Sequence, residues 1–166
     1  MSLSELLRDY ARYNHWANTL IVNWLREKPT DLMTREVPSS FPSLQGTLLH
    51  IWDAENVWLE RLTGTSPNGF PSQNFAGTAE DVFVGLLKAS ADLRDFLQNQ
   101  PDDFFQWTLE YRFFNGQPGA SLVAQMVQHC IQHSTFHRGQ IVTIARNLGL
   151  TDPPKTDYIH FSRLKS

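Results

Sequence analysis

The chain has 166 residues and a formal net charge of −3, and this length suits one domain with its own hydrophobic core. We therefore predict a single domain over residues 1–166. The sequence has no basic stripe and no apolar run of roughly 20 residues, so neither nucleic acid nor a membrane is an expected partner. It lacks a signal-peptide pattern and has one cysteine, Cys130, which fits a cytoplasmic protein.

Four segments repeat apolar residues at the spacing of one helical face, and they predict four long helices. Ser43 and Thr78 are suitable caps for the second and third helices, and Asp81 completes a capping box with Thr78. Gly149 is typical of a residue that ends a helix. The predicted helices cover residues 2–27, 43–63, 78–99 and 120–148.

The segment QWTLEYRFFNGQPGA has a different pattern from the helices around it. Apolar and polar residues alternate along it, and Asn115-Gly116 is a hairpin turn signal. We predict a short extended arm here and an ordered but irregular tail after Gly149. The expected fold is all-α: a four-helix bundle with long loops and a short extended arm before the last helix.

Three histidines follow one another at intervals of four residues inside the apolar stripe of the last predicted helix. They are His129, His133 and His137. Residues four apart point the same way and rise about 6 Å along the axis, so two such imidazoles can bind one metal ion. Core or rim histidines bonded to backbone and hydroxyl groups would also fit, and spacing alone does not say which pair would bind.

His50 is the candidate for a third ligand, because it lies on the inward face predicted for the second helix. Three histidines would leave coordination positions open, as a catalytic metal requires. Asp53, one turn later, could orient a ligand ring or stay solvated. No Glu-x-x-His or His-Glu-x-x-His motif is present, which excludes a di-iron carboxylate bundle and a zincin protease.

The segments YNHWAN, LLHI, HSTFHRGQI and DPPKTDYI together resemble the DinB/YfiT-like superfamily of metal-binding four-helix bundles. The resemblance implies that His50, His133 and His137 bind one divalent metal, nickel or zinc. Iron and manganese also suit three imidazoles. His129 would then support the site or pack in the core. Trp16 would line the pocket, with ordinary core packing as the alternative.

Two further residues follow the second histidine of the HSTFHRGQ motif. Gln140 lies near the histidine face and is expected to contact a ligand ring. Arg138 points roughly 140° away from His133, which favours a surface or interface ion pair. Cys130 is expected to be a small buried hydrophobic residue rather than a thiolate ligand.

The second predicted helix has another apolar face opposite His50, interrupted only by Glu55. A bundle helix needs one apolar stripe, so a second stripe must pack on another chain or beneath long loops. The family resemblance also implies a dimer. We predict a homodimer through this face, which comprises Leu48, Trp52, Leu59 and Leu62.

Some relatives in this superfamily are transferases or isomerases that use low-molecular-weight thiols. The resemblance therefore implies a metal-dependent enzyme that transfers a thiol to a small electrophile. A metal-assisted hydrolase and a non-enzymatic dimeric module for ligand binding or stress response are the alternatives. A fourth protein ligand closing the metal site would favour the non-enzymatic alternative.

Overall fold

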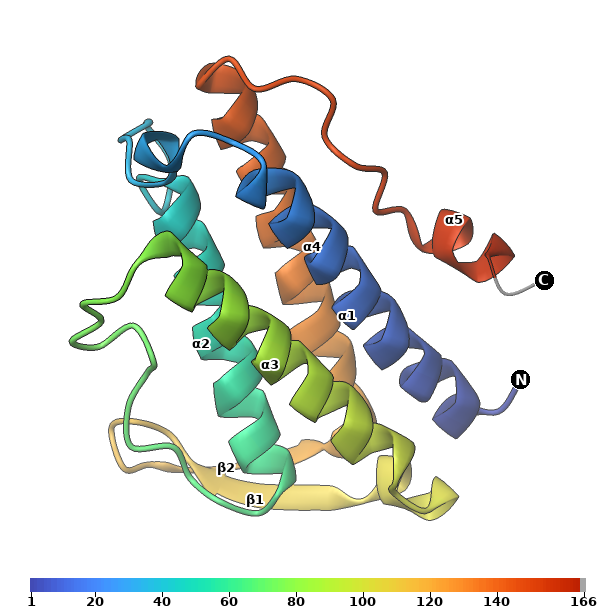
Figure 1. Ribbon diagram of the computed structural model, residues 1–166. Coiled ribbons are helices and arrows are strands. Elements are labelled where there is room, and N and C mark those ends of the chain that lie inside the picture. The colour runs from blue at the N-terminus through green and yellow to red at the C-terminus, as the bar shows by residue number, and fades with distance from the viewer. Residues whose placement is uncertain (165–166) are drawn as a thin grey trace.

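The computed structural model describes residues 1–164 and is built mainly from four long helices (Figure 1). This confirms the all-α bundle expected from the sequence. A six-residue helix, α5, is the last helix among residues 1–164, and two short 3-10 turns, η1 and η2, lie in the connections. The elements are α1 Leu3–Arg26, η1 Thr30–Met33, α2 Leu44–Leu62, α3 Ala79–Gln98, η2 Asp102–Gln106, β1 Thr108–Arg112, β2 Pro118–Leu122, α4 Val123–Asn147 and α5 Tyr158–Arg163.

Side-chain caps begin three of the four long helices. Ser2 accepts a hydrogen bond from the Glu5 amide in a complete capping box. Ser43 accepts from the Gly46 amide at 3.0 Å, and Thr78 forms the expected box with Asp81. Each cap provides a partner for an amide that has none inside its own helix. Helix α4 instead continues directly from strand β2 and has no side-chain cap.

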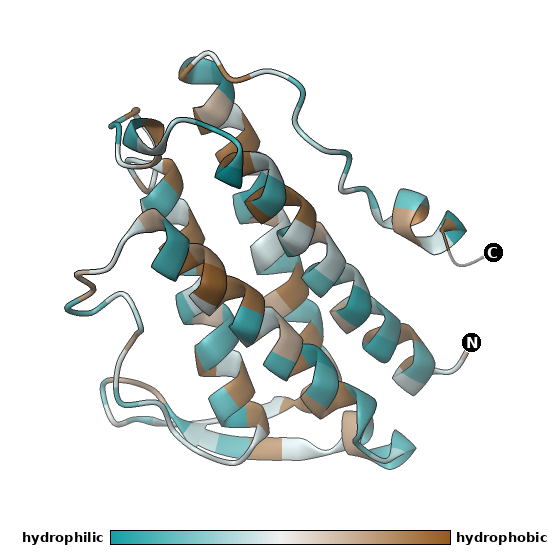
Figure 2. Cartoon of the chain, viewed as in Figure 1, coloured by the Kyte–Doolittle hydropathy of each residue, from teal (hydrophilic) through white to brown (hydrophobic). Residues whose placement is uncertain are grey.

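The helices run up, down, down and up in chain order, because the long 63–78 connection returns along the bundle before α3 begins (Figure 1). Helix α2 packs against both α3 and α4, and α1 packs against the same two helices. Helices α2 and α4 are therefore antiparallel neighbours. Figure 2 shows hydrophobic and hydrophilic positions interleaved along every long helix, as one buried face requires.

The core consists of two apolar clusters, one toward each end of the bundle. One includes Leu7, Leu97 and Met126 near the hairpin, and the other includes Ile21, Leu48 and Ile141 near the α1–α2 connection. A layer of buried polar side chains separates them along the helices.

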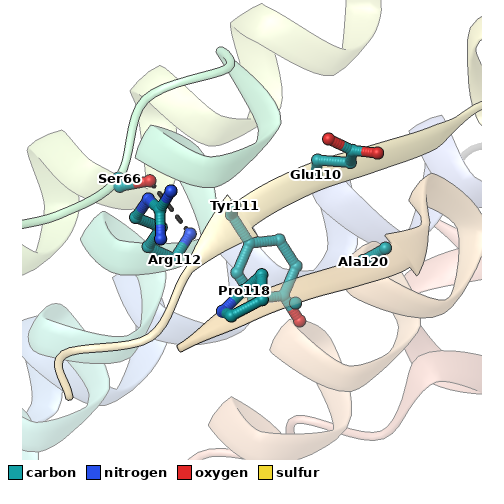
Figure 3. A pocket seen from close by; sticks show the side chains of 7 residues that line it. Ser66, Glu110, Tyr111, Arg112, Pro118 and Ala120 are labelled. Atoms are coloured by element: carbon teal, nitrogen blue, oxygen red, sulfur yellow. Dashed lines mark hydrogen bonds between the residues drawn. The ribbon is translucent and has the colours of Figure 1, made fainter. Parts of the chain in front are cut away.

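Strands β1 and β2 form an antiparallel hairpin where the sequence predicted a short extended arm with an Asn-Gly turn signal. Gly116, with φ of 81°, supplies the positive backbone angle of the Asn-Gly turn. The guanidinium of Arg61 lies 4.7 Å from the Trp58 ring and 4.5 Å from the Tyr111 ring, which ties the hairpin to α2. A surface pocket of about 480 Å³ lies along the strands (Figure 3).

The prediction of an irregular tail was wrong at one point, because residues 158–163 form α5. Phe161 of α5 packs against Tyr13 and Trp16 of α1, at ring distances of 5.8 and 5.3 Å. A short apolar stretch can become helical where a neighbouring helix covers it, although it carries too few residues to show periodicity. No helix within residues 1–164 combines the length and the hydropathy needed to cross a membrane.

The second apolar face of α2 has partners inside the same chain. Leu48 and Leu62 are 1% and 3% exposed, and Trp52 and Leu59 pack partly buried against the two core clusters. Trp52 covers Gly85 of α3 so closely that a Cβ there would lie 2.4 Å from its ring. Intramolecular packing therefore buries Leu48 and Leu62 and covers part of Trp52 and Leu59. A homodimer remains a prediction of the family resemblance without support from this face.

Candidate metal centre

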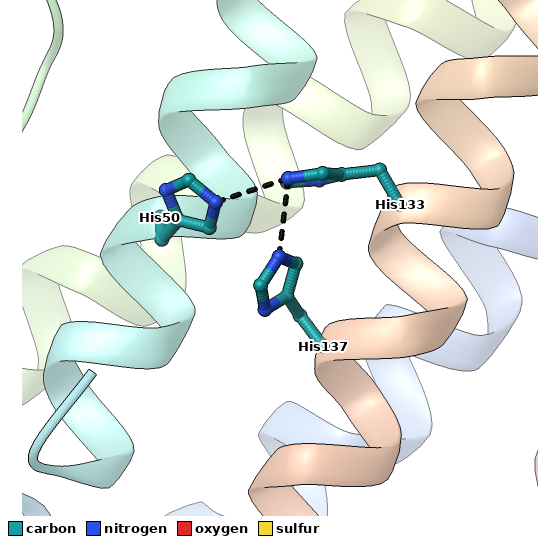
Figure 4. Close-up of side chains that lie close together, drawn as sticks. All are labelled: His50, His133 and His137. Atoms are coloured by element: carbon teal, nitrogen blue, oxygen red, sulfur yellow. Dashed lines mark hydrogen bonds between the residues drawn. The ribbon is translucent and has the colours of Figure 1, made fainter. Parts of the chain in front are cut away.

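Three histidines from two neighbouring helices meet midway along the bundle, with their rings turned toward one another (Figure 4). The Nε2 atom of His133 lies 3.0 Å from Nε2 of His50 and 3.1 Å from Nε2 of His137. His50 comes from α2, and the other two come from α4. All three potential ligand atoms lie within 4.8 Å of one another.

The local sequence explains this convergence. The four-residue spacing places His133 and His137 on one face of α4, one turn apart. The antiparallel packing of α2 on α4 then brings His50 opposite both of them. His137 is buried, and the other two rings are partly exposed. The cluster therefore lies at the edge of the bundle, where a small molecule can approach it.

The donor set fits a divalent transition metal. Bonds of about 2.1 Å in tetrahedral geometry place neighbouring nitrogens about 3.4 Å apart. The observed separations are 3.0 and 3.1 Å, so small movements of the rings would bring these nitrogens to that spacing. This three-histidine cluster could hold a metal ion.

The surroundings favour the neutral imidazoles that metal binding needs. Burial, together with repulsion from His137, His50 and His129, lowers the pKa of His133 from 6.5 to about 4. Burial also lowers the pKa of His50 and of His137. All three rings are thus uncharged at neutral pH and carry a lone pair for a metal.

Gln140 contacts the centre as expected from the sequence. Its Oε1 atom lies 2.7 Å from Nδ1 of His137. With the amide oxygen facing the ring, Nδ1–H donates, and the lone pair of the neutral ring is left on Nε2. Nε2 is the atom that faces the other two histidines. The Nδ1 atom of His133 is buried and has no hydrogen-bond partner among residues 1–164.

Phe41 covers the centre and was not identified from the sequence. Its ring stacks on His50 at a centroid distance of 4.0 Å and an angle of 22°, and it meets the edge of His137 at 5.6 Å. Phe41 lies in the connection between η1 and α2, two residues before the Ser43 cap. A connecting segment has no periodicity from which the direction of a side chain could be inferred.

Three residues that the sequence predicted near the metal have other surroundings: Asp53, His129 and Trp16. Asp53 is only 6% exposed and accepts hydrogen bonds from the Ser72 amide and hydroxyl at 2.8 and 2.6 Å, so it is neither solvated nor bonded to His50. Its charge still opposes the lowering of the His50 pKa. His129 is exposed, and its ring lies 6.0 Å from His133 and 5.1 Å from Trp58.

Trp16 packs against α5 rather than against the histidines. Its ring contacts are with Tyr13, His160 and Phe161. The core-packing alternative therefore describes Trp16 better than a role in lining the pocket. Cys130 is fully buried, and burial raises the pKa of its thiol well above the usual value, which agrees with a small core residue.

A buried polar network lies behind the histidines, and Glu55 is its acceptor. The Glu55 carboxylate is 0% exposed. It accepts four hydrogen bonds of 2.6–2.9 Å, which come from Asn14, Asn18, Ser90 and Ser134. These donors belong to α1, α3 and α4, so one carboxylate from α2 connects all four helices.

The expectation of a surface or interface ion pair for Arg138 was wrong, because Arg138 is 2% exposed and belongs to this network. Its Nη1 donates to the side-chain oxygens of Asn14 and Asn18, each at 2.7 Å, and its Nη2 donates to Thr135 at 2.8 Å. The helical angle correctly predicted that Arg138 points away from His133. That direction leads into the bundle, which a single helix cannot reveal.

The fold and the site together define a class of protein: a four-helix bundle in which neighbouring helices bring together a three-histidine cluster that could hold a metal. The chain belongs to the DinB family, whose sequence profile matches residues 1–165. It is 29% identical over 165 residues to Protein DinB of Bacillus subtilis (strain 168), covering 94% of this chain and 93% of that one.

A crystal structure of a DinB-like protein from Bacillus cereus ATCC 10987 has a similar fold. The TM-score is 0.67, the sequence identity is 19%, and the match covers 87% of this chain and 91% of the other.

Proposed function

We propose that this protein is a metal-dependent enzyme that transfers a low-molecular-weight thiol to a small electrophile. One observation carries the proposal: three imidazoles face one another through their Nε2 atoms at the partly exposed edge of the bundle. His50, His133 and His137 would hold one divalent ion, with nickel or zinc preferred and iron or manganese as alternatives.

The composition of the cluster supports a catalytic rather than a structural ion. Within residues 1–164, no cysteine, aspartate, glutamate or further histidine joins the group. Structural zinc sites normally close four positions with protein ligands, whereas catalytic sites keep a position open for water or substrate. A bound metal would lower the pKa of a thiol or water in that position and so supply a nucleophile at neutral pH.

The chain's own residues prepare the site for this chemistry. Gln140 holds the tautomer of His137 that presents Nε2 to the centre. Phe41 stacks on His50 and limits the access of water to one side of the cluster. A metal-assisted hydrolase would use the same features, so turnover assays must distinguish thiol transfer from hydrolysis.

The first experiment measures metal per chain by plasma mass spectrometry on untagged protein. The wild type should contain about one divalent ion per chain after reconstitution, and His133→Ala should contain almost none. His129→Ala is the matched control, since His129 lies on the same helix but outside the cluster, and it should keep the metal. Absence of metal from the reconstituted wild type would leave the non-enzymatic module as the better reading.

A second experiment assays the metal-loaded protein with panels of thiols, electrophiles and esters. Thiol-dependent product formation that is lost in His133→Ala supports the transferase. Hydrolysis without a thiol would favour the hydrolase instead. Absence of turnover in both panels would contradict catalysis.

A homodimer is part of the proposal because the family resemblance implies one. Light scattering coupled to size exclusion should give about twice the subunit mass, and a single subunit mass would remove the dimer.

A further inference from the structure

A groove of about 410 Å³ lies beside the histidine centre, between residues 38–40 and the second half of α4. Two of its lining residues also touch the centre. The Phe136 ring meets the His137 ring edge-on at 5.1 Å, and Gln140 contacts Nδ1 of His137. On the other side, Ser40 lines the groove and precedes Phe41, which stacks on His50. A molecule in this groove would therefore lie against the same residues that enclose the cluster.

The lining of the groove selects an uncharged occupant. None of the residues that form it carries a charge. Ser39, Ser40 and Asn147 offer hydroxyl and amide donors. Phe136 is 64% exposed, which leaves a flat apolar ring facing solvent at the mouth of the groove. A flat ligand that stacks on this ring would remove its apolar surface from water.

Gly139 forms the open floor of the groove. A Cβ at this position would meet no atom within 4 Å, so packing does not demand a glycine. Its backbone angle is not positive either, since it lies within the regular helix α4. A glycine inside a helix costs about 0.5–1 kcal/mol relative to alanine. What this glycine provides is empty space next to His137 and Gln140.

We propose that the groove is the binding site for the electrophile: a flat, uncharged aromatic or conjugated molecule that carries hydrogen-bond acceptors. This inference rests on the proposed thiol transfer and adds the class of the second substrate. With an aryl chloride, the thiolate sulfur attacks the ring carbon that bears chlorine. A carbon–sulfur bond forms, the carbon–chlorine bond breaks, and chloride leaves with the electron pair. The thiol proton passes to solvent, and nothing is oxidised or reduced.

The test uses chlorodinitrobenzene as the electrophile and cysteine as the thiol, with metal-loaded protein. Gly139→Phe adds a ring at a residue that lines the groove, where its Cβ would meet no atom within 4 Å. It should raise the KM for chlorodinitrobenzene about tenfold or more, with unchanged metal content and unchanged KM for cysteine. Gly139→Ala should have a smaller effect in the same direction. Gln128→Phe places the same side chain on an exposed position of α4 outside the groove and is the matched control.

A binding experiment separates failure of this inference from failure of the proposed chemistry. Dinitrobenzene, which lacks the leaving group, is titrated into each protein and followed by amide chemical shifts. Binding to the wild type and to Gln128→Phe, but not to Gly139→Phe, supports the groove even if no thiol is transferred. Equal binding to Gly139→Phe, or no binding to the wild type, overturns it, as does an unchanged KM in Gly139→Phe.

Discussion

Two polar regions involve both α2 and α4, and they differ in the kinds of group that meet in them. The histidine cluster joins like groups at the bundle edge, where the Nε2 atoms face one another and Nδ1 of His133 has no partner within the described chain. The Glu55 network joins opposite charges at the centre through Asn14 and Asn18. Four donors reach the Glu55 carboxylate, while Nε of Arg138 has no partner among residues 1–164. Both regions use adjacent residues of α4, because Ser134 follows His133 and Arg138 follows His137.

The difference separates a site prepared for a ligand from a contact that stabilises the fold. A buried carboxylate with all its donors in place holds helices in one register. Three imidazole nitrogens that face one another at an accessible edge can instead give their lone pairs to a bound metal ion. The same two helices therefore carry both functions on different faces of α4, and substitutions can affect them separately.

The largest expected effect comes from removing the centre of the network. Glu55→Ala should lower the free energy of unfolding by about 3–5 kcal/mol, because Arg138 would remain buried without its counter-charge. Urea unfolding of the metal-free protein measures this loss. Asp92→Ala, which removes an exposed carboxylate on α3, should cost less than about 1 kcal/mol. A similar small loss for Glu55→Ala would mean that the network does not hold the bundle.

The next effect is a pH dependence of the metal-free protein that comes from the histidine cluster. His133 binds a proton near pH 6.5 when unfolded but only near pH 4 when folded, so the unfolded state binds more protons between these values. Stability should therefore fall as the pH drops from 7.5 to 5. For this partly exposed ring the slope should stay below about 1.4 kcal/mol per pH unit.

Urea titrations at several pH values measure that slope. The His133→Asn variant should have a shallower one, because it no longer carries the titrating ring. An equal slope in the variant would show that other groups cause the acid sensitivity.

Gln140→Ala should weaken metal binding about 10- to 100-fold, because His137 loses the partner that fixes its tautomer and orientation. Competition with a chromogenic chelator measures the affinity. Gln132 is an exposed glutamine of α4 immediately before His133, and Gln132→Ala should bind metal as the wild type does. If the two variants bind equally, the Gln140 contact does not tune the site.

The smallest effect is expected for Ser134→Ala, which removes one of four donors to Glu55. It should cost about 1–2 kcal/mol of stability and leave the metal content unchanged, although its neighbour His133 is a ligand in the proposed site. Thermal unfolding and metal analysis on the same sample make the comparison. Loss of metal without loss of stability would show that the two regions are not separable.

Much of the fold could be predicted because the relevant signals are local. Apolar spacing and the Ser43, Thr78 and Gly149 signals located the long helices within a few residues. The Asn115-Gly116 pair located the hairpin turn. The tail helix could not be predicted, because its six residues depend on contacts with α1.

The candidate site was predictable in its histidines but not in its surroundings. Spacing put His129, His133 and His137 on one helical face, and the inward face of the second helix pointed to His50. The family resemblance then selected His133 and His137 from that row, and these two meet His50 in the structure. The contact of Phe41 with His50 was not predicted, because Phe41 lies in a connection without periodicity. Arg138 was predicted at the surface, because the sequence of one helix does not show which of its faces the other helices cover. On the α2 face predicted to form a dimer, Leu48 and Leu62 are buried by the same chain, and Trp52 and Leu59 are partly buried.

The sequence by itself determined the helices, their caps, the turn and the row of histidines, since these depend on residues within a few positions of one another. Only the tertiary structure decided which side chains meet across helices. Helix packing placed four donors around Glu55, namely Asn14, Asn18, Ser90 and Ser134. It also brought Ser72 within hydrogen-bonding distance of Asp53 and left open space next to Gly139. The physical reason is that such contacts depend on how whole helices pack, which no local spacing specifies.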